Sequence, residues 1–187
     1  MKRLAAVLCC VALFCVLAAG CKKTPADTPS DGTLGTTVPD SAADTLKLAF
    51  NREDTLNPFS ATTELNLQLA SLLYDVLVRP DAAFSPVLSL AKTAEFTDKT
   101  HLTVTLQHRN FSDGSAVTVN DVLYSFRAAK ASQNYGAALS NFSGAAGAKD
   151  SVIFTLVFPD PHAAACLYFP IIQQKTDTAA AAAAPVG

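Results

Sequence analysis

The chain has 187 residues, half of them hydrophobic, and it contains five Cys and no Trp. Its 14 Lys and Arg are balanced by 16 Asp and Glu, for a formal net charge of −2 at pH 7. This balance, with no basic cluster beyond the extreme N-terminus and Lys22-Lys23, argues against nucleic acid as a partner, and we expect none.

Residues 1–20 predict an export signal. Two basic residues precede an unbroken apolar run, and small residues stand directly before Cys21. Such an order is typical of secretory signals, and the run is shorter than the roughly 20 residues of a membrane-spanning helix. The small residues and Cys21 resemble the bacterial lipoprotein box. We predict cleavage before Cys21 and lipidation of its thiol; an uncleaved anchor helix is the alternative.

This processing decides the role of the cysteines. Three of them leave with the signal and Cys21 carries the lipid, so Cys166 remains alone and no disulfide forms within the mature chain. Cys166 lies among apolar residues. We expect a small core residue there, not a reactive thiol.

Residues 21–44 predict a flexible tether, and residues 45–187 predict the folded part. The tether is rich in Thr, Pro, Asp, Ser, Gly and Ala, and it has too little apolar surface to fold. Alternating apolar residues at Leu46, Leu48 and Phe50 then predict a short strand, which a loop at Asn57-Pro58 follows.

The first predicted helix spans Thr62–Val78. Apolar residues recur at helical spacing, from Leu65 to Leu77. Ser60 or Thr62 can cap the helix, Glu64 lies in the first turn where the helix dipole favours an acid, and Arg79-Pro80 should end it. Residues 94–97 and 101–107 should then pair as a hairpin across Asp98-Lys99-Thr100.

A strand, a tight turn and a capped helix are predicted between Leu102 and Ala129. Leu102, Val104 and Leu106 alternate with polar residues, as in a half-buried strand. The turn contains Gly114, which takes a positive φ without steric cost. Thr118 lies three residues before Asp121, the spacing of a capping box. The predicted helix places Val122, Phe126 and Ala129 on one face, with Leu123 beside them.

The rest of the chain predicts fewer elements. Residues 132–148 are rich in Gly, Ala, Ser and Asn and read as a connection. A strand follows in which Val152, Phe154, Leu156 and Phe158 alternate, and residues 162–169 predict a short apolar helix. The alanine run at 179–184 is helix-prone, and fraying as a chain end is the alternative.

The segment from Phe111 to Phe126 resembles a known family. Its FSDG turn and the following T-x-x-D-V-x-Y-S-F match the corresponding motif of the peptide- and nickel-binding class of extracellular solute-binding proteins, the capture components of ABC importers. Ala116 replaces the usual Pro, and Val119 replaces the usual Ala. The resemblance covers about residues 46–187, and family members are usually more than twice as long. It implies an α/β fold, the N-terminal portion of a two-lobed periplasmic-binding-protein-like fold of type II.

The resemblance also implies a binding region. In the family the ligand lies in a cleft between two lobes, and the loop before the first helix forms part of its wall. By position, this loop is Ser60, Ala61, Thr62, Thr63 and Glu64. Hydroxyls and free helix amides can bond a peptide main chain, and Glu64 can take a ligand amine. The alternative is that these residues only cap the helix.

Tyr135 is a second candidate for ligand contact, and packing on its own lobe is the alternative. No catalytic motif is present, and His101, His108 and His162 have no partners at metal-ligand spacing. We therefore expect no enzymatic activity, no metal and no cofactor.

The predicted function is capture of a peptide or related small solute outside the cytoplasmic membrane for delivery to ABC permease subunits, by a monomer held by its lipid. A peptide-sensing or interaction lipoprotein, and a truncated product that binds nothing, are the alternatives.

Overall fold

The computed structural model describes residues 47–174 and Gly187. The predicted signal, Cys21, the tether and the alanine run lie outside these residues. The elements follow in the order α2 (Glu64–Leu73), β1 (Val78–Pro80), β2 (Pro86–Leu88), β3 (Ala91–Phe96), β4 (His101–Leu106), α3 (Val119–Ala131), β5 (Phe142–Gly147), β6 (Ser151–Leu156) and the 3₁₀ turn η1 (Ala163–Cys166).

A four-stranded sheet of order β3-β4-β6-β5 forms the centre of the fold, and all its neighbouring strands are antiparallel. The predicted hairpin is confirmed: β3 pairs with β4, and Phe96 lies opposite Leu102. Buried and half-exposed residues alternate along β4 and β6. One face of these strands therefore points to the core and the other to solvent.

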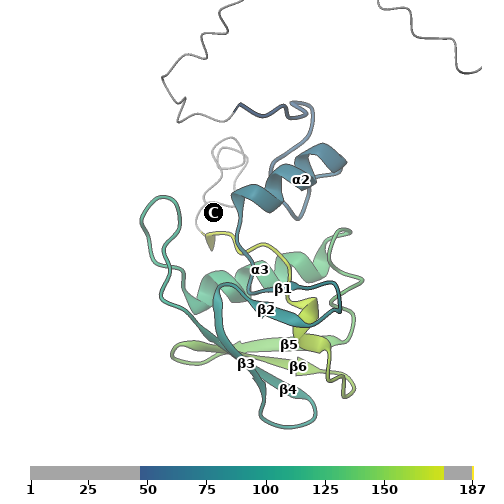
Figure 1. The fold of residues 1–187 in the computed structure, drawn as a ribbon, viewed down its shortest axis with the longest axis vertical. Helices are drawn as coiled ribbons and strands as arrows, with labels where there is room; N and C mark the ends of the chain where they lie inside the picture. Colours follow the sequence, from purple (N-terminus) through teal and green to yellow (C-terminus); the bar gives the residue numbers. More distant parts are fainter. Residues whose placement is uncertain (1–46, 175–186) are drawn as a thin grey trace, which may run out of the picture. The chain divides into compact units, whose positions relative to one another are not determined.

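Helix α3 covers the core face of this sheet (Figure 1). The predicted face is confirmed, because Val122, Phe126 and Ala129 are buried. The Phe126 ring packs edge-on against Phe154, with 5.2 Å between the ring centroids, and against Phe142 at 6.2 Å. Edge-to-face contacts of this kind add to the free energy of apolar burial.

The capping box of α3 is formed as predicted. The Thr118 hydroxyl accepts from the Asp121 amide at 3.3 Å, and the Asp121 carboxylate accepts from the Thr118 amide at 2.9 Å. Gly114 has a φ of 83°, which places the predicted turn in the left-handed region. Asp113 accepts from the amide and hydroxyl of Ser115, so its carboxylate stabilises this turn.

Strand β5 corrects the interpretation of residues 132–148 as a connection only. Its sequence, FSGAAG, has little intrinsic strand preference. The strand forms because it pairs with β6, where Ala145 lies opposite Phe154 and Gly147 opposite Val152. Small residues at these positions let α3 approach, since a Cβ on Gly147 would lie 2.7 Å from Val119.

The first predicted helix was too long. Helix α2 ends at Leu73, and Tyr74 has extended backbone. Leu77 and Val78 are buried outside the helix, Leu77 at a bend and Val78 in β1, and Arg79-Pro80 belong to β1 instead of ending a helix. Leucine and valine at these positions can be buried in a strand as well as in a helix. The spacing of the apolar residues therefore could not show where α2 ends.

The buried face of α2 also differs from the predicted leucine face. Asn66 and Ala70 are the buried residues of the helix, whereas Leu72 is 70% exposed. The Asn66 side chain is held between two backbone groups, donating to the carbonyls of Asn51 and Thr55 at 3.0 and 3.1 Å. A polar residue can occupy this buried position because its hydrogen bonds are satisfied.

Two further expectations were wrong. The described part of the first predicted strand, residues 47–50, is not a strand, and Leu48 and Phe50 are exposed. These residues pair with no strand in the described part of the chain. Alternation of apolar and polar residues alone therefore does not make them a strand. The predicted helix at 162–169 is reduced to the single turn η1, and Phe158 lies exposed beyond the end of β6.

We expect Thr118→Ala to lower the free energy of unfolding by about 0.5–2 kcal/mol, because the hydroxyl that caps α3 is lost. Urea denaturation monitored by circular dichroism measures the change. Thr118→Ser keeps the hydroxyl and should retain most of the stability. Equal losses in both variants would contradict the capping role.

Candidate functional site

The candidate site is the loop that leads into α2. Ser60, Thr62 and Glu64 are exposed, Thr63 is half-buried and Ala61 is buried. The structure brings all of them together as one continuous turn. It starts at Asn57, whose carbonyl accepts from the amides of Ser60 and Ala61 at 3.2 and 2.9 Å.

The cap of α2 is Asp54, not Ser60 or Thr62 as predicted. The N-cap residue is Thr63, and its own side chain makes no capping bond. Instead, the Asp54 carboxylate accepts from the amides of Thr62 and Thr63 at 3.0 and 2.7 Å and from the Thr63 hydroxyl at 2.6 Å. These hydrogen bonds, that from the Thr63 hydroxyl first, hold the pKa of Asp54 well below its ordinary value.

Asp54 changes which groups of the loop are available to a ligand. It already uses the amides of Thr62 and Thr63, which a peptide could otherwise bind. The hydroxyls of Ser60 and Thr62 make no hydrogen bond within the described residues. The Glu64 carboxylate accepts only from the Gln68 side chain there, at 3.0 Å. Two hydroxyls and one carboxylate therefore remain at the surface.

An aromatic cluster supports the loop. The rings of Phe59 and Tyr135 meet at 6.0 Å and 77°, and those of Tyr135 and Tyr168 meet at 6.0 Å and 60°. Burial raises the pKa of Tyr135, and Tyr168 adds to the shift. Tyr135 thus packs on its own part of the fold, the alternative considered for it.

The side chain of Asn134, in the connection that follows α3, holds the loop before α2 in place. Its side-chain amide donates to the carbonyls of Pro58 and Ala61, both at 3.0 Å. Asn134 therefore holds the backbone at Pro58 and Ala61, and Asp54 holds it at Thr62 and Thr63, while the outer side chains of the loop stay exposed. A preorganised loop of this kind loses little entropy when it binds a ligand.

Sequence reasoning missed Asp54, Phe59, Asn134 and Tyr168. Asp54 precedes the N-cap residue Thr63 by nine residues, outside the spacing of local capping motifs. Asn134 and Tyr168 lie far from the loop along the chain. The one local signal was Asn57, whose side chain accepts from the Phe59 amide at 3.0 Å, as in an Asx turn.

Other titratable groups show structural roles. His101 pairs with Asp98, with Nδ1 at 2.7 Å from the carboxylate. Cys166 is half-buried against the core, and burial raises its pKa. Within residues 47–174 and Gly187, no cluster of three or more His, Cys, Asp or Glu could hold a metal. None of the helices described there is long and apolar enough to cross a membrane.

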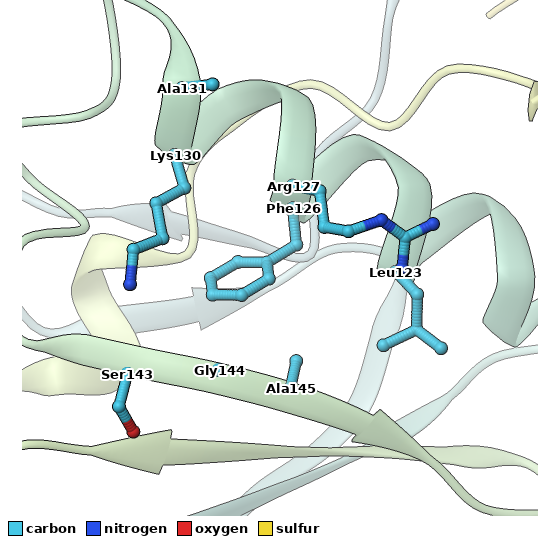
Figure 2. Close-up of a pocket in the computed structure, with 8 residues that line it drawn as sticks. All are labelled: Leu123, Phe126, Arg127, Lys130, Ala131, Ser143, Gly144 and Ala145. Atoms are coloured by element: carbon cyan, nitrogen blue, oxygen red, sulfur yellow. The ribbon is translucent and has the colours of Figure 1, made fainter.

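Two open cavities lie away from this loop. One, of about 410 Å³, lies between α3 and β5 (Figure 2). The other, of about 430 Å³, lies between the β3–β4 turn and residues 159–161.

The fold matches solved structures of substrate-binding proteins. NikZ from Campylobacter jejuni, in complex with Ni(L-His), aligns with a TM-score of 0.59 and 20% identity over 73% of this chain and 30% of its own. MoaA from A. tumefaciens R10, in complex with mannopinic acid, aligns with a TM-score of 0.57 and 28% identity over 65% of this chain and 27% of its own. AppA from Bacillus subtilis, an oligopeptide-binding protein in complex with a nonapeptide, aligns with a TM-score of 0.53 and 21% identity over 65% of this chain and 25% of its own.

The described residues therefore have the mixed α/β fold of part of a substrate-binding protein of the peptide- and nickel-binding ABC class, as the motifs predicted. The chain spans about a quarter to a third of the length of these proteins, consistent with an N-terminal portion. No family model and no curated protein matches the sequence significantly.

We expect Asp54→Asn to remove part of the acid sensitivity of the fold. Because the pKa of Asp54 is lowered by folding, its carboxylate stabilises the folded state above the unfolded pKa of about 3.9, and this contribution is lost as the pH falls below that value. Urea midpoints at about pH 6 and pH 3 should differ less in Asp54→Asn than in the wild type.

Asp150→Asn is the matched control, because the Asp150 side chain is exposed and makes no hydrogen bond within the described residues. It should keep the wild-type difference between the two pH values. An unchanged pH dependence in Asp54→Asn would contradict the capping role.

Proposed function

We propose that this protein is the solute-binding component of an ABC importer. The observation that carries the proposal is the fold, which aligns with substrate-binding proteins solved with a nonapeptide, with Ni(L-His) and with mannopinic acid. The FSDG-to-YSF motif supports it independently from the sequence.

The proposed ligand is a peptide or a related small solute, bound without covalent chemistry. The loop before α2 offers suitable groups: the hydroxyls of Ser60 and Thr62 for a ligand main chain and the carboxylate of Glu64 for an amine. Thr63 would act indirectly, since its hydroxyl binds Asp54. We propose no resident metal or cofactor and no enzymatic activity.

In the two-lobed family that the sequence resembles, the ligand lies in a cleft between two lobes, and this chain covers 25 to 30% of the matched proteins. A single lobe cannot close over a ligand by hinge motion. We therefore expect residues 46–187 alone to bind peptides weakly or not at all, and submicromolar affinity would contradict this two-lobe mechanism.

The location we propose is the outer face of the cytoplasmic membrane. A lipid on Cys21 and the tether that follows would keep the protein, as a monomer, near the permease. Acyl chains anchor strongly because each buried methylene contributes roughly 0.8 kcal/mol.

A peptide-sensing lipoprotein is the second candidate, because the same fold and loop chemistry serve recognition without transport. Accumulation of a labelled peptide inside cells distinguishes the two. Uptake that depends on this protein supports transport, and peptide binding without uptake supports sensing. Absence of peptide binding by the complete natural reading frame would support the truncated, non-binding alternative.

We expect Glu64→Gln to weaken binding of peptides with a free amino terminus by roughly tenfold, because a charge-assisted hydrogen bond to the ligand amine is lost. Isothermal titration of the complete mature protein measures this. N-acetylated peptides should bind wild type and variant alike. Glu95→Gln, an equivalent change on exposed β3, is the control. Equal affinity of wild type and Glu64→Gln for free-amine peptides would remove Glu64 from the site.

Cys21→Ala should move the protein from the membrane fraction to the soluble fraction, because the thiol that carries the lipid is absent. Fractionation followed by immunoblotting measures the shift. Cys166→Ala keeps the predicted lipid site and should stay with the membrane. Retention of Cys21→Ala in the membrane fraction would contradict the lipoprotein interpretation.

A further inference from the structure

Strand β5 leaves one edge of the main sheet unpaired. The strand order β3-β4-β6-β5 gives β5 a partner on one side only, and among the described residues no strand pairs with its outer side. Along such an edge, alternate backbone amides and carbonyls point outward and can pair with another extended chain. Apart from the buried Phe142, the side chains of β5 are small, so they leave the edge accessible.

A groove of about 410 Å³ runs beside this edge, between α3 and β5 (Figure 2). The rings and side chains of α3 form its upper wall, and Figure 2 shows Phe126 pointing down toward β5 and Ala145 pointing up from the strand. Gly144 and Ala145 fill little of the space below. The groove therefore has an apolar base next to the outer edge of β5.

The groove carries positive charge. Arg127 is exposed and forms no ion pair within the described residues. Lys130 directs its ammonium to the carbonyl of Phe142, the first residue of β5. An ammonium has three donors, so others remain for a ligand. Among residues 47–174 and Gly187, no acidic side chain lines the groove, although the whole chain has a net charge of −2.

The spacing of the two cations fits an extended acidic chain. Arg127 and Lys130 are three residues apart on one helix, a rise of about 4.5 Å. In an extended strand, side chains on the same face recur every second residue, about 6.6 Å apart. Arg and Lys side chains are long and flexible, so they can make up the difference between the helix spacing and the strand spacing. Figure 2 shows α3 running along β5, so one strand can pair with β5 and reach both cations.

We propose that an acidic, extended peptide segment of a partner protein adds to the free edge of β5, with acidic side chains at alternate positions bound by Arg127 and Lys130. Backbone hydrogen bonds to β5 give affinity, and the two cations make the surface selective for a negatively charged peptide. This interaction surface lies on α3 and β5, not on the loop before α2, and it goes beyond the proposed solute-binding function.

The test uses the full chain and a fluorescein-labelled heptapeptide of alternating Glu and Val, followed by fluorescence anisotropy. The wild type should bind the probe, and binding should fall steeply at about 1 M salt, where the Debye length is about 3 Å. The same peptide with Gln in place of Glu should bind at least roughly tenfold more weakly.

Three variants locate the site. Arg127→Glu should weaken binding by roughly tenfold or more, because it replaces attraction with repulsion at an exposed position. Ala145→Leu should also weaken binding, since it fills the groove without changing charge. Lys92→Glu, the same charge reversal on exposed β3 at the opposite edge of the sheet, should change affinity by less than about twofold. Circular dichroism verifies that each variant is folded.

N-methylated probes test the strand pairing. Methyl groups on the amides of one edge of the peptide should abolish binding, and methyl groups on the other edge should not, because only one edge faces β5. The proposal is overturned if the wild type does not bind the Glu probe, if Arg127→Glu binds like the wild type, or if both methylated probes bind equally. Loss of binding in Glu64→Gln but not in Arg127→Glu would assign the probe to the solute site instead.

Discussion

The packing of α3 on the main sheet is the constraint on which the rest of the structure depends. Phe126 lies 3% exposed among three other aromatic rings, and one of them, Phe169, comes from the chain after η1. The same helix holds the C-terminal part of the described chain: Ser125 bonds both the amide and the carbonyl of Ile172, and Asp121 accepts from the amide of Gln174 at 2.9 Å. One helix therefore joins the sheet to the segment that follows η1, by apolar and polar contacts together.

The family motif owes its residues to this packing more than to ligand contact. Thr118 and Asp121 cap α3, Ser125 anchors Ile172, and Phe126 fills the core. None of these side chains is free for a solute. The exposed groups of the loop before α2 are the better candidates for recognition, because Asn134 and the aromatic cluster of Phe59, Tyr135 and Tyr168 hold its backbone while its outer side chains remain exposed.

Much of the fold could be predicted where a local rule and the tertiary environment agree. The β3–β4 hairpin, the turn at Gly114 and the capping box of α3 follow from spacing within a few residues, and the structure has all three. The errors occur where a distant partner decides. Strand β5 forms because β6 is available to pair with it, and the predicted first helix was too long because Leu77 and Val78 are buried outside α2, at a bend and in β1. Of the candidate site, the exposed hydroxyls and Glu64 could be predicted from the sequence. The hydrogen bonds of Asp54 and the aromatic cluster under the loop could not, since those contacts join separate parts of the chain.

The amino-acid sequence by itself determined the class of fold and those local conformations of this protein that depend on a few neighbouring residues. A turn that needs a positive φ, a Thr three residues from an Asp and a two-residue apolar period each act over a short stretch of chain, so they can be identified without coordinates. Only the tertiary structure decided which polar groups remain available. Asp54 uses the amides at the start of α2, while the strand order exposes the edge of β5 beside Arg127 and Lys130. Availability depends on every group that lies nearby in space, and local patterns contain no information about groups distant in the chain.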